Sequence, residues 1–160
     1  LERRRARLDG YARAFALASK RYRGTPEAPG LVLGLDWQPD ATCEGMAFRV
    51  CPTLARTVRD YLHRREMVTR SYVEVVLPVA LETGARVDAL AYVLDRTHPQ
   101  YVGRQPLDAQ AAIIAQAHGP AGPNSEYLAS TAAHLREIGV PDAELDALDA
   151  LVRRHAGRRA

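Results

Sequence analysis

Residues 54–72 read LARTVRDYLHRREMVTRSY, and this stretch decides the fold because it joins a helix to the strand that follows it. Its apolar side chains recur at helical spacing and are expected to face a core: Leu54, Val58, Tyr61 and Leu62. Pro52 suits the first turn of this helix, where its missing N–H leaves no hydrogen bond unmade. Glu66 follows the last apolar position, at an element end where a carboxylate can be half-buried, and is our candidate for the reactive group.

Strands are expected on both sides of this helix, where apolar residues alternate or form short runs. The predicted strands are residues 8–19, 31–37, 43–50, 71–81 and 86–94. Residues 38–42 and 82–85 are polar and predict the turns of two hairpins. Residues 23–30 contain two prolines and two glycines, which exclude a regular ladder or helix and predict a loop.

The character of the chain changes after residue 106, because three helices are predicted in a row: residues 107–117, 123–137 and 142–154. Their starts carry Asp108, Asn124 and Asp142 as acidic or capping groups. Strands first and helices last predict an α+β fold with a mainly antiparallel sheet. At 160 residues the chain fits one domain, residues 1–160.

Composition limits the classes of protein that remain. Apolar residues make up 47% and charged residues 26% of the sequence, as in ordinary soluble proteins. No apolar run approaches the ~20 residues of a membrane span. The net charge of +3 comes from arginines spread over the chain, and the basic segments contain only Tyr22 as an interleaved aromatic residue, so we expect no nucleic-acid partner. Two cysteines, Cys43 and Cys51, are too few for a disulfide scaffold and indicate a cytoplasmic setting.

Glu66 has two interpretations on spacing alone. A lone glutamate is usually a solvated charge, and Arg64 and Arg65 would keep its carboxylate ionised if they faced it. A general acid or base instead requires burial, which raises the pKa of a carboxyl from ~4.3 toward 6–7. The sequence leaves both alternatives open.

Other motifs indicate little chemistry. The five histidines and two cysteines show no metal-site spacing, and the sequence contains no nucleophile elbow, P-loop or dinucleotide fingerprint. Residues 119–124, GPAGPN, form a second loop before a predicted helix. Backbone N–H groups at such a helix start can bind a carboxylate, although a simple helix cap is the more frequent role.

Four phrases occur in the order and spacing of a known family: residues 23–30 (RGTPEAPG), 61–66 (YLHRRE), 98–103 (HPQYVG) and 119–127 (GPAGPNSEY). Together they resemble the ChaC family of γ-glutamylcyclotransferases, and the similarity extends over residues 7–156. The resemblance implies a small, mixed, mainly antiparallel β-barrel with flanking helices.

The resemblance also implies an activity. Family members cleave the γ-glutamyl amide of glutathione to 5-oxoproline and cysteinylglycine without a metal or organic cofactor. Their catalytic glutamate follows arginine in the phrase Tyr-Leu-x-x-Arg-Glu, which makes it Glu66 here. We expect loops 23–30 and 101–103 to lie around the substrate, with these candidate binding residues: Arg23, Gly24, Thr25, Pro26 and Tyr101.

One family phrase is missing from the 160 residues: the Tyr-Gly-Ser-Leu loop that follows an N-terminal strand and cradles the γ-glutamyl end. We expect that strand and loop to precede Leu1 in a longer chain, and the alternative is a homologue that has lost its site. Two other functions remain open, a cyclotransferase for other γ-glutamyl amines and a non-catalytic binding domain on the same scaffold.

Overall fold

The computed structural model describes residues 2–157, and the chain divides into two units of structure. The units are residues up to Arg13 with Gly34–Tyr101, and Ala14–Leu33 with the residues from Val102 onward. Strands β1 (Glu2–Ser19) and β2 (Gly30–Arg49) each run from one unit into the other. The first unit therefore contains the stretch around Glu66, and the second contains the C-terminal helices.

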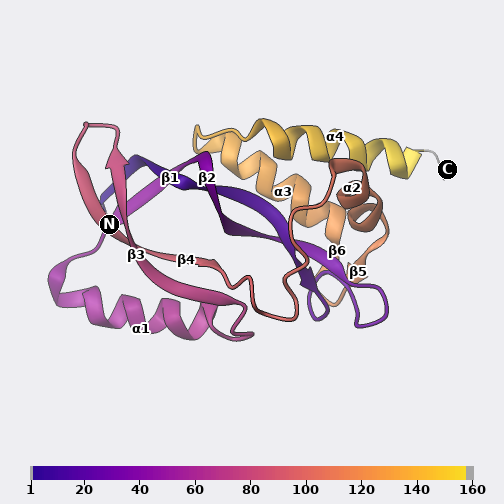
Figure 1. Ribbon diagram of the computed structural model, residues 1–160, viewed down its shortest axis with the longest axis horizontal. Coiled ribbons are helices and arrows are strands. Elements are labelled where there is room, and N and C mark those ends of the chain that lie inside the picture. The colour runs from indigo at the N-terminus through magenta and orange to yellow at the C-terminus, as the bar shows by residue number, and fades with distance from the viewer. Residues whose placement is uncertain (1, 158–160) are drawn as a thin grey trace. The chain divides into compact units, whose positions relative to one another are not determined.

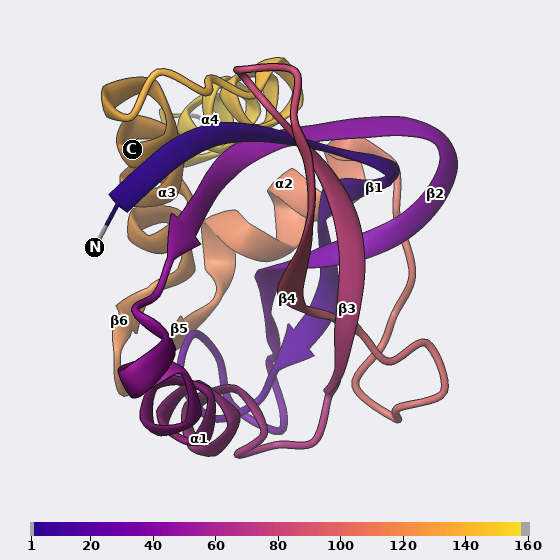
Figure 2. The ribbon, with the colours of Figure 1, turned by 90° about the vertical axis from the view of Figure 1, so that its left-hand side faces the viewer.

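The first unit is built on a closed barrel with the strand order β1-β2-β4-β3. Strands β3 (Tyr72–Leu81) and β4 (Arg86–Leu94) form an antiparallel hairpin, and β3 is also antiparallel to β1. Strand β2 lies parallel to β4. Figure 2 shows how strongly β1 and β2 curve. The predicted α+β fold with a mixed, mainly antiparallel barrel is confirmed.

The predicted hairpin in residues 31–50 is wrong, because β2 continues as one strand through the expected turn. The Pro-Asp pair at 39–40 favours a turn in isolation. In the barrel, however, the backbone oxygen of Trp37 accepts a hydrogen bond from Arg96, and the Thr42 hydroxyl donates to Asp9 of β1 at 3.2 Å. Tertiary contacts thus keep the polar segment extended.

Helix α1 (Ala55–Glu66) follows a 3₁₀ turn, η1, that begins at Pro52. The helix is present as predicted, but it buries no residue. The expectation that its apolar residues face a core is wrong for Leu54 and Tyr61, which are 54% and 55% exposed. Long polar side chains connect α1 to the barrel instead, as described for the site below.

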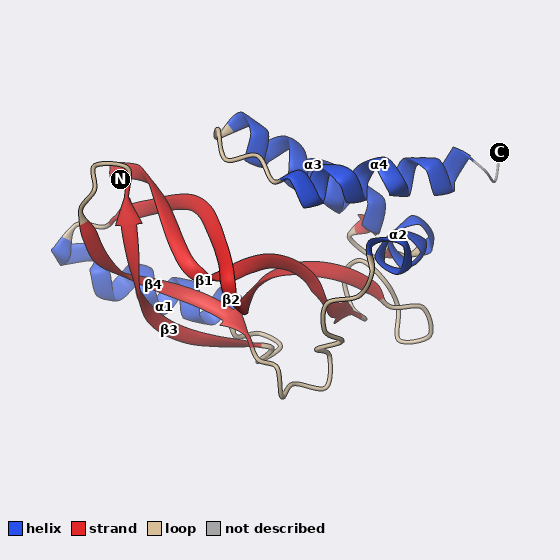
Figure 3. Ribbon diagram, turned by 45° about the horizontal axis from the view of Figure 1, so that its top comes forward, coloured by secondary structure: helices blue, strands red, loops and turns tan. Residues whose placement is uncertain are grey.

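The second unit contains the predicted C-terminal helices, α2 (Leu107–Gln116), α3 (Asn124–Glu137) and α4 (Ala143–Gly157). A small antiparallel pair, β5 (His118–Gly119) and β6 (Gly122–Pro123), lies between α2 and α3 in the chain. Figures 1 and 3 show α3 and α4 side by side. The core is apolar and includes Phe15, Leu31, Ile114, Leu128, Leu135 and Leu148.

The helix starts differ in how they are capped. Asp142 accepts hydrogen bonds from the backbone N–H groups of Glu144 and Leu145 at 3.1 and 3.2 Å, as expected of a cap. Asp108 lies in the first turn of α2, where its negative charge interacts favourably with the helix dipole. Asn124 is not a cap, because its side-chain amide forms hydrogen bonds with the backbone of Leu31 instead. Within residues 2–157 no helix is long and apolar enough to cross a membrane.

Candidate active site

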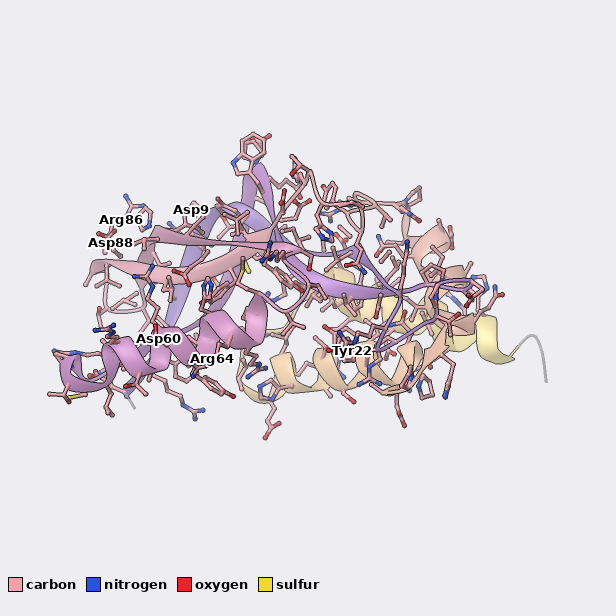
Figure 4. All side chains as sticks on the ribbon, turned by 90° about the horizontal axis from the view of Figure 1, so that it is seen from below. Asp9, Tyr22, Asp60, Arg64, Arg86 and Asp88 are labelled. Atoms are coloured by element: carbon pink, nitrogen blue, oxygen red, sulfur yellow. The ribbon has the colours of Figure 1, made fainter. Side chains whose placement is uncertain are left out.

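Glu66 is the last residue of α1, and its side chain is 31% exposed. The last turn of the helix is completed by a hydrogen bond from the N–H of Met67 to the backbone oxygen of His63, at 2.9 Å. Arg65 Nε lies 3.3 Å from Glu66 Oε1. Arg64 is exposed on the same helix, where Figure 4 labels it. The carboxylate is therefore partly buried and paired with one of the two arginines.

A polar cluster that the sequence did not predict joins α1 to the barrel. Arg59 Nε and Nη2 donate to Glu74 Oε1 at 2.9 and 2.6 Å. His63 Nδ1 lies 3.2 Å from the second oxygen, Oε2, to which the Tyr92 hydroxyl also donates at 2.8 Å. Glu74 of β3 and Tyr92 of β4 are directly opposite each other in the hairpin. We call these four residues the Glu74 cluster.

The contacts within the Glu74 cluster shift the pKa values of two of its members further from neutrality. Hydrogen bonds from Tyr92 and then from Arg59 lower the pKa of Glu74 to about 2. Burial, and then the hydrogen bond to Glu74, raise the pKa of Tyr92 to about 12, and the charge of Glu66 adds to this rise. At neutral pH the Glu74 carboxylate is thus ionised and the Tyr92 phenol keeps its proton.

Tyr101 lies in the first unit and contacts another buried carboxylate. Its hydroxyl donates to Asp36 Oδ2 at 3.1 Å, while Arg96 Nε donates to Asp36 Oδ1 at 2.8 Å. The Arg96 guanidinium also stacks over the rings of Trp37 and Tyr101, at 5.5 and 5.8 Å from their centroids. Burial raises the pKa of Tyr101, and the hydrogen bond to Asp36 adds to the effect. This phenol therefore supports the loop that follows β4.

The other four candidate binding residues lie in the second unit, in the loop after β1. Arg23 reaches the backbone oxygen of Pro123 at 3.3 Å, and its guanidinium lies 5.3 Å from the centroid of the Tyr127 ring. Thr25 Oγ1 accepts from the N–H of Ala28 at 3.1 Å. Gly24 is buried, and Pro26 is exposed. Two of the family phrases, residues 23–30 and 119–127, are thus brought together.

Close backbone contact explains the glycines in these phrases. A Cβ on Gly24 would lie 2.1 Å from the backbone nitrogen of Gly30, and one on Gly30 would lie 2.3 Å from the backbone oxygen of Arg23. Any larger residue would have to move the backbone. Asn124 completes the contact, because its side chain bonds both the N–H and the backbone oxygen of Leu31, at 2.6 and 2.7 Å.

A hollow of about 650 Å³ lies at the other end of the β3–β4 hairpin from the Glu74 cluster. It is lined mainly by charged residues, including Arg5, Arg7, Glu44, Glu82 and Arg86. Two of these charges pair with a neighbouring carboxylate. Arg7 and Arg86 both pair with Asp9, at 3.2 and 3.7 Å, and Figure 4 labels the second pair. Among residues 2–157 no group of three or more acidic, histidine or cysteine side chains is arranged to hold a metal ion.

The barrel and helices have the fold of the γ-glutamylcyclotransferases. A crystal structure of a yeast γ-glutamyl cyclotransferase specific to glutathione superimposes with a TM-score of 0.82 and 25% identity, over 96% of this chain and 88% of that one. The model of the ChaC-like protein family matches residues 1–155, and the chain belongs to this family.

Curated relatives agree with the family assignment. The glutathione-specific γ-glutamylcyclotransferase of Escherichia coli K12 is 33% identical over 141 residues, which are 88% of this chain and 60% of the relative. The enzyme of the same name from Schizosaccharomyces pombe is 36% identical over 148 residues, 82% of this chain and 72% of that protein. The chain thus spans 60% to 72% of the length of these two relatives.

Proposed function

We propose that the protein is a glutathione-specific γ-glutamylcyclotransferase with Glu66 as its general acid and base. The proposal rests mainly on one observation: the chain matches the ChaC-like family along residues 1–155 and keeps the Arg-Glu end of the family's phrase at residues 65–66. The position of Glu66 fits this role, because its side chain is partly buried at the end of a helix rather than extended into solvent.

The reaction is an intramolecular attack within the substrate. The α-amine of the γ-glutamyl group attacks the γ-carbonyl carbon, the amide C–N bond breaks, and 5-oxoproline and cysteinylglycine are formed. Nucleophile and electrophile belong to one molecule, so closing a five-membered ring uses the rate advantage of proximity. The protein must then move protons and stabilise the oxyanion that develops on the carbonyl oxygen.

One carboxylate can transfer both protons. Glu66 would accept the proton that the attacking amine loses and return it to the nitrogen of the leaving cysteinylglycine, so the carboxylate is regenerated. Backbone N–H groups of a glycine-containing loop would stabilise the oxyanion. Arg23, Gly24, Thr25, Pro26 and Tyr101 remain our candidates for substrate binding.

We place the protein in the cytoplasm and assign it neither a nucleic-acid nor a membrane partner. Cys43 and Cys51 both remain thiols, which fits a reducing compartment. Several arginines are engaged with carboxylates of the protein itself: Arg59, Arg96, Arg136 and Arg153. These pairs reduce the positive charge available to phosphates.

The test is release of 5-oxoproline from glutathione by the full-length protein. We expect turnover of glutathione and little or none of simple γ-glutamyl amino acids or γ-glutamyl amines. Faster turnover of a γ-glutamyl amine would change the assigned substrate but keep the reaction. Tight binding of glutathione without any release of 5-oxoproline would show that the protein is a binding domain and not an enzyme.

A further inference from the structure

The orientation of α1 is not fixed by a hydrophobic core, since the helix buries no residue. Arg59, His63 and Glu66 are spaced i, i+4 and i+7, so they form one stripe along the helix. The first two members of the stripe contact Glu74 of the barrel. The third, Glu66, lies one turn beyond His63 on the same side.

Glu74 is suited to hold the helix and unsuited to react. Only 14% of its side chain is exposed, and both carboxylate oxygens are engaged by the contacts described above. With every favourable acceptor direction used and its pKa near 2, Glu74 cannot take a proton from an amine at neutral pH. Tyr92 donates its own proton to Glu74, so it is not a proton source either.

We infer that Glu74 is a positioning residue for the proposed reaction: by binding Arg59, His63 and Tyr92 it fixes the end of α1 on the β3–β4 hairpin and thereby sets the place of the Glu66 carboxylate. The inference rests on the proposed function of Glu66. Tyr92 has a supporting role, because its hydroxyl orients the carboxylate that the helix binds.

This arrangement affects turnover rather than substrate affinity. A general base must stay within hydrogen-bond reach of the reacting nitrogen, and a misplacement of about 1 Å can cost on the order of 100-fold in rate. Glu74 itself has no free oxygen for a substrate. Its removal should therefore lower kcat and leave KM nearly unchanged.

The test compares three variants and one control variant of the full-length protein in the glutathione assay. Glu74→Gln keeps the size of the side chain but removes its charge, and we expect kcat to fall about 10- to 100-fold. Glu74→Asp keeps the charge on a shorter side chain and should recover part of this loss. Tyr92→Phe removes one of the contacts to Glu74 and should lower kcat less than Glu74→Gln. Asp60→Asn removes an exposed charge from the same helix, labelled in Figure 4, and is the matched control with unchanged kcat.

A second measurement does not depend on activity. Amide hydrogen exchange reports local opening, and the Met67 N–H bonded to His63 should exchange about tenfold faster in Glu74→Gln than in the wild type. Unchanged kcat in Glu74→Gln overturns the inference, whatever the exchange rate, and so does a loss of kcat with unchanged exchange. If the wild type cyclises no γ-glutamyl compound, the proposed function fails, and exchange alone then decides whether Glu74 fixes the helix end.

Discussion

Replacing Glu66 by glutamine is expected to lower 5-oxoproline release from glutathione by about 10²- to 10⁴-fold, the contribution of a general acid and base. Glutamine is close to glutamate in shape but cannot accept the proton of the attacking amine. The substitution should not unfold the protein, because Glu66 pairs with Arg65, at 3.3 Å, and that arginine is 65% exposed. The measurement is kcat at saturating glutathione, together with a thermal unfolding curve.

Glu82→Gln provides the control for this prediction. Glu82 is an exposed glutamate in the turn between β3 and β4 of the same unit, so the same chemical change is made away from α1. Its kcat should match the wild type. Near-normal turnover by Glu66→Gln would remove Glu66 from the mechanism, even with the family assignment intact.

Local sequence patterns predicted the elements that are stabilised by contacts between neighbouring segments of the chain. The valine-rich strand β3, the turn at residues 82–85 and the return strand β4 could be read from the sequence, because pairing in a hairpin joins neighbouring segments. Strand β2 could not. Its Pro-Asp segment is kept extended by contacts to Asp9 and Arg96, which are distant in sequence, and no local propensity encodes such contacts.

The candidate site likewise contains one residue that the sequence predicted and a cluster that it did not. The position of Glu66 at the end of the predicted helix made it a candidate, and the family phrase that it ends gave it the expected catalytic role. The Glu74 cluster was missed because it depends on the register that sets Glu74 opposite Tyr92 and on the placement of α1 beside that pair. Arg59 and His63 at i and i+4 were a weak signal, since such pairs are frequent on solvated helices.

The contact between the two glycine-containing phrases supplies the last strong prediction, for Asn124→Ala. Asn124 is fully buried, and its amide satisfies both the N–H and the backbone oxygen of Leu31. Alanine would leave both backbone groups without a partner in the interior, where each costs about 1–3 kcal/mol. We therefore expect the free energy of unfolding to fall by about 2–5 kcal/mol, measured by urea denaturation.

Ser130→Ala is the matched control, because it removes an exposed polar side chain from the same helix, α3. Its effect should stay within about 0.5 kcal/mol. If the free energy of unfolding of Asn124→Ala falls by less than about 0.5 kcal/mol, then water or a shift of the loop at residues 23–30 replaces the lost hydrogen-bond partners. Such a shift has little room, because a Cβ on Gly30 would lie 2.3 Å from the backbone oxygen of Arg23, a contact that Asn124→Ala leaves in place. The close backbone contact that requires glycine is therefore also the reason that the loss of this one amide should be costly.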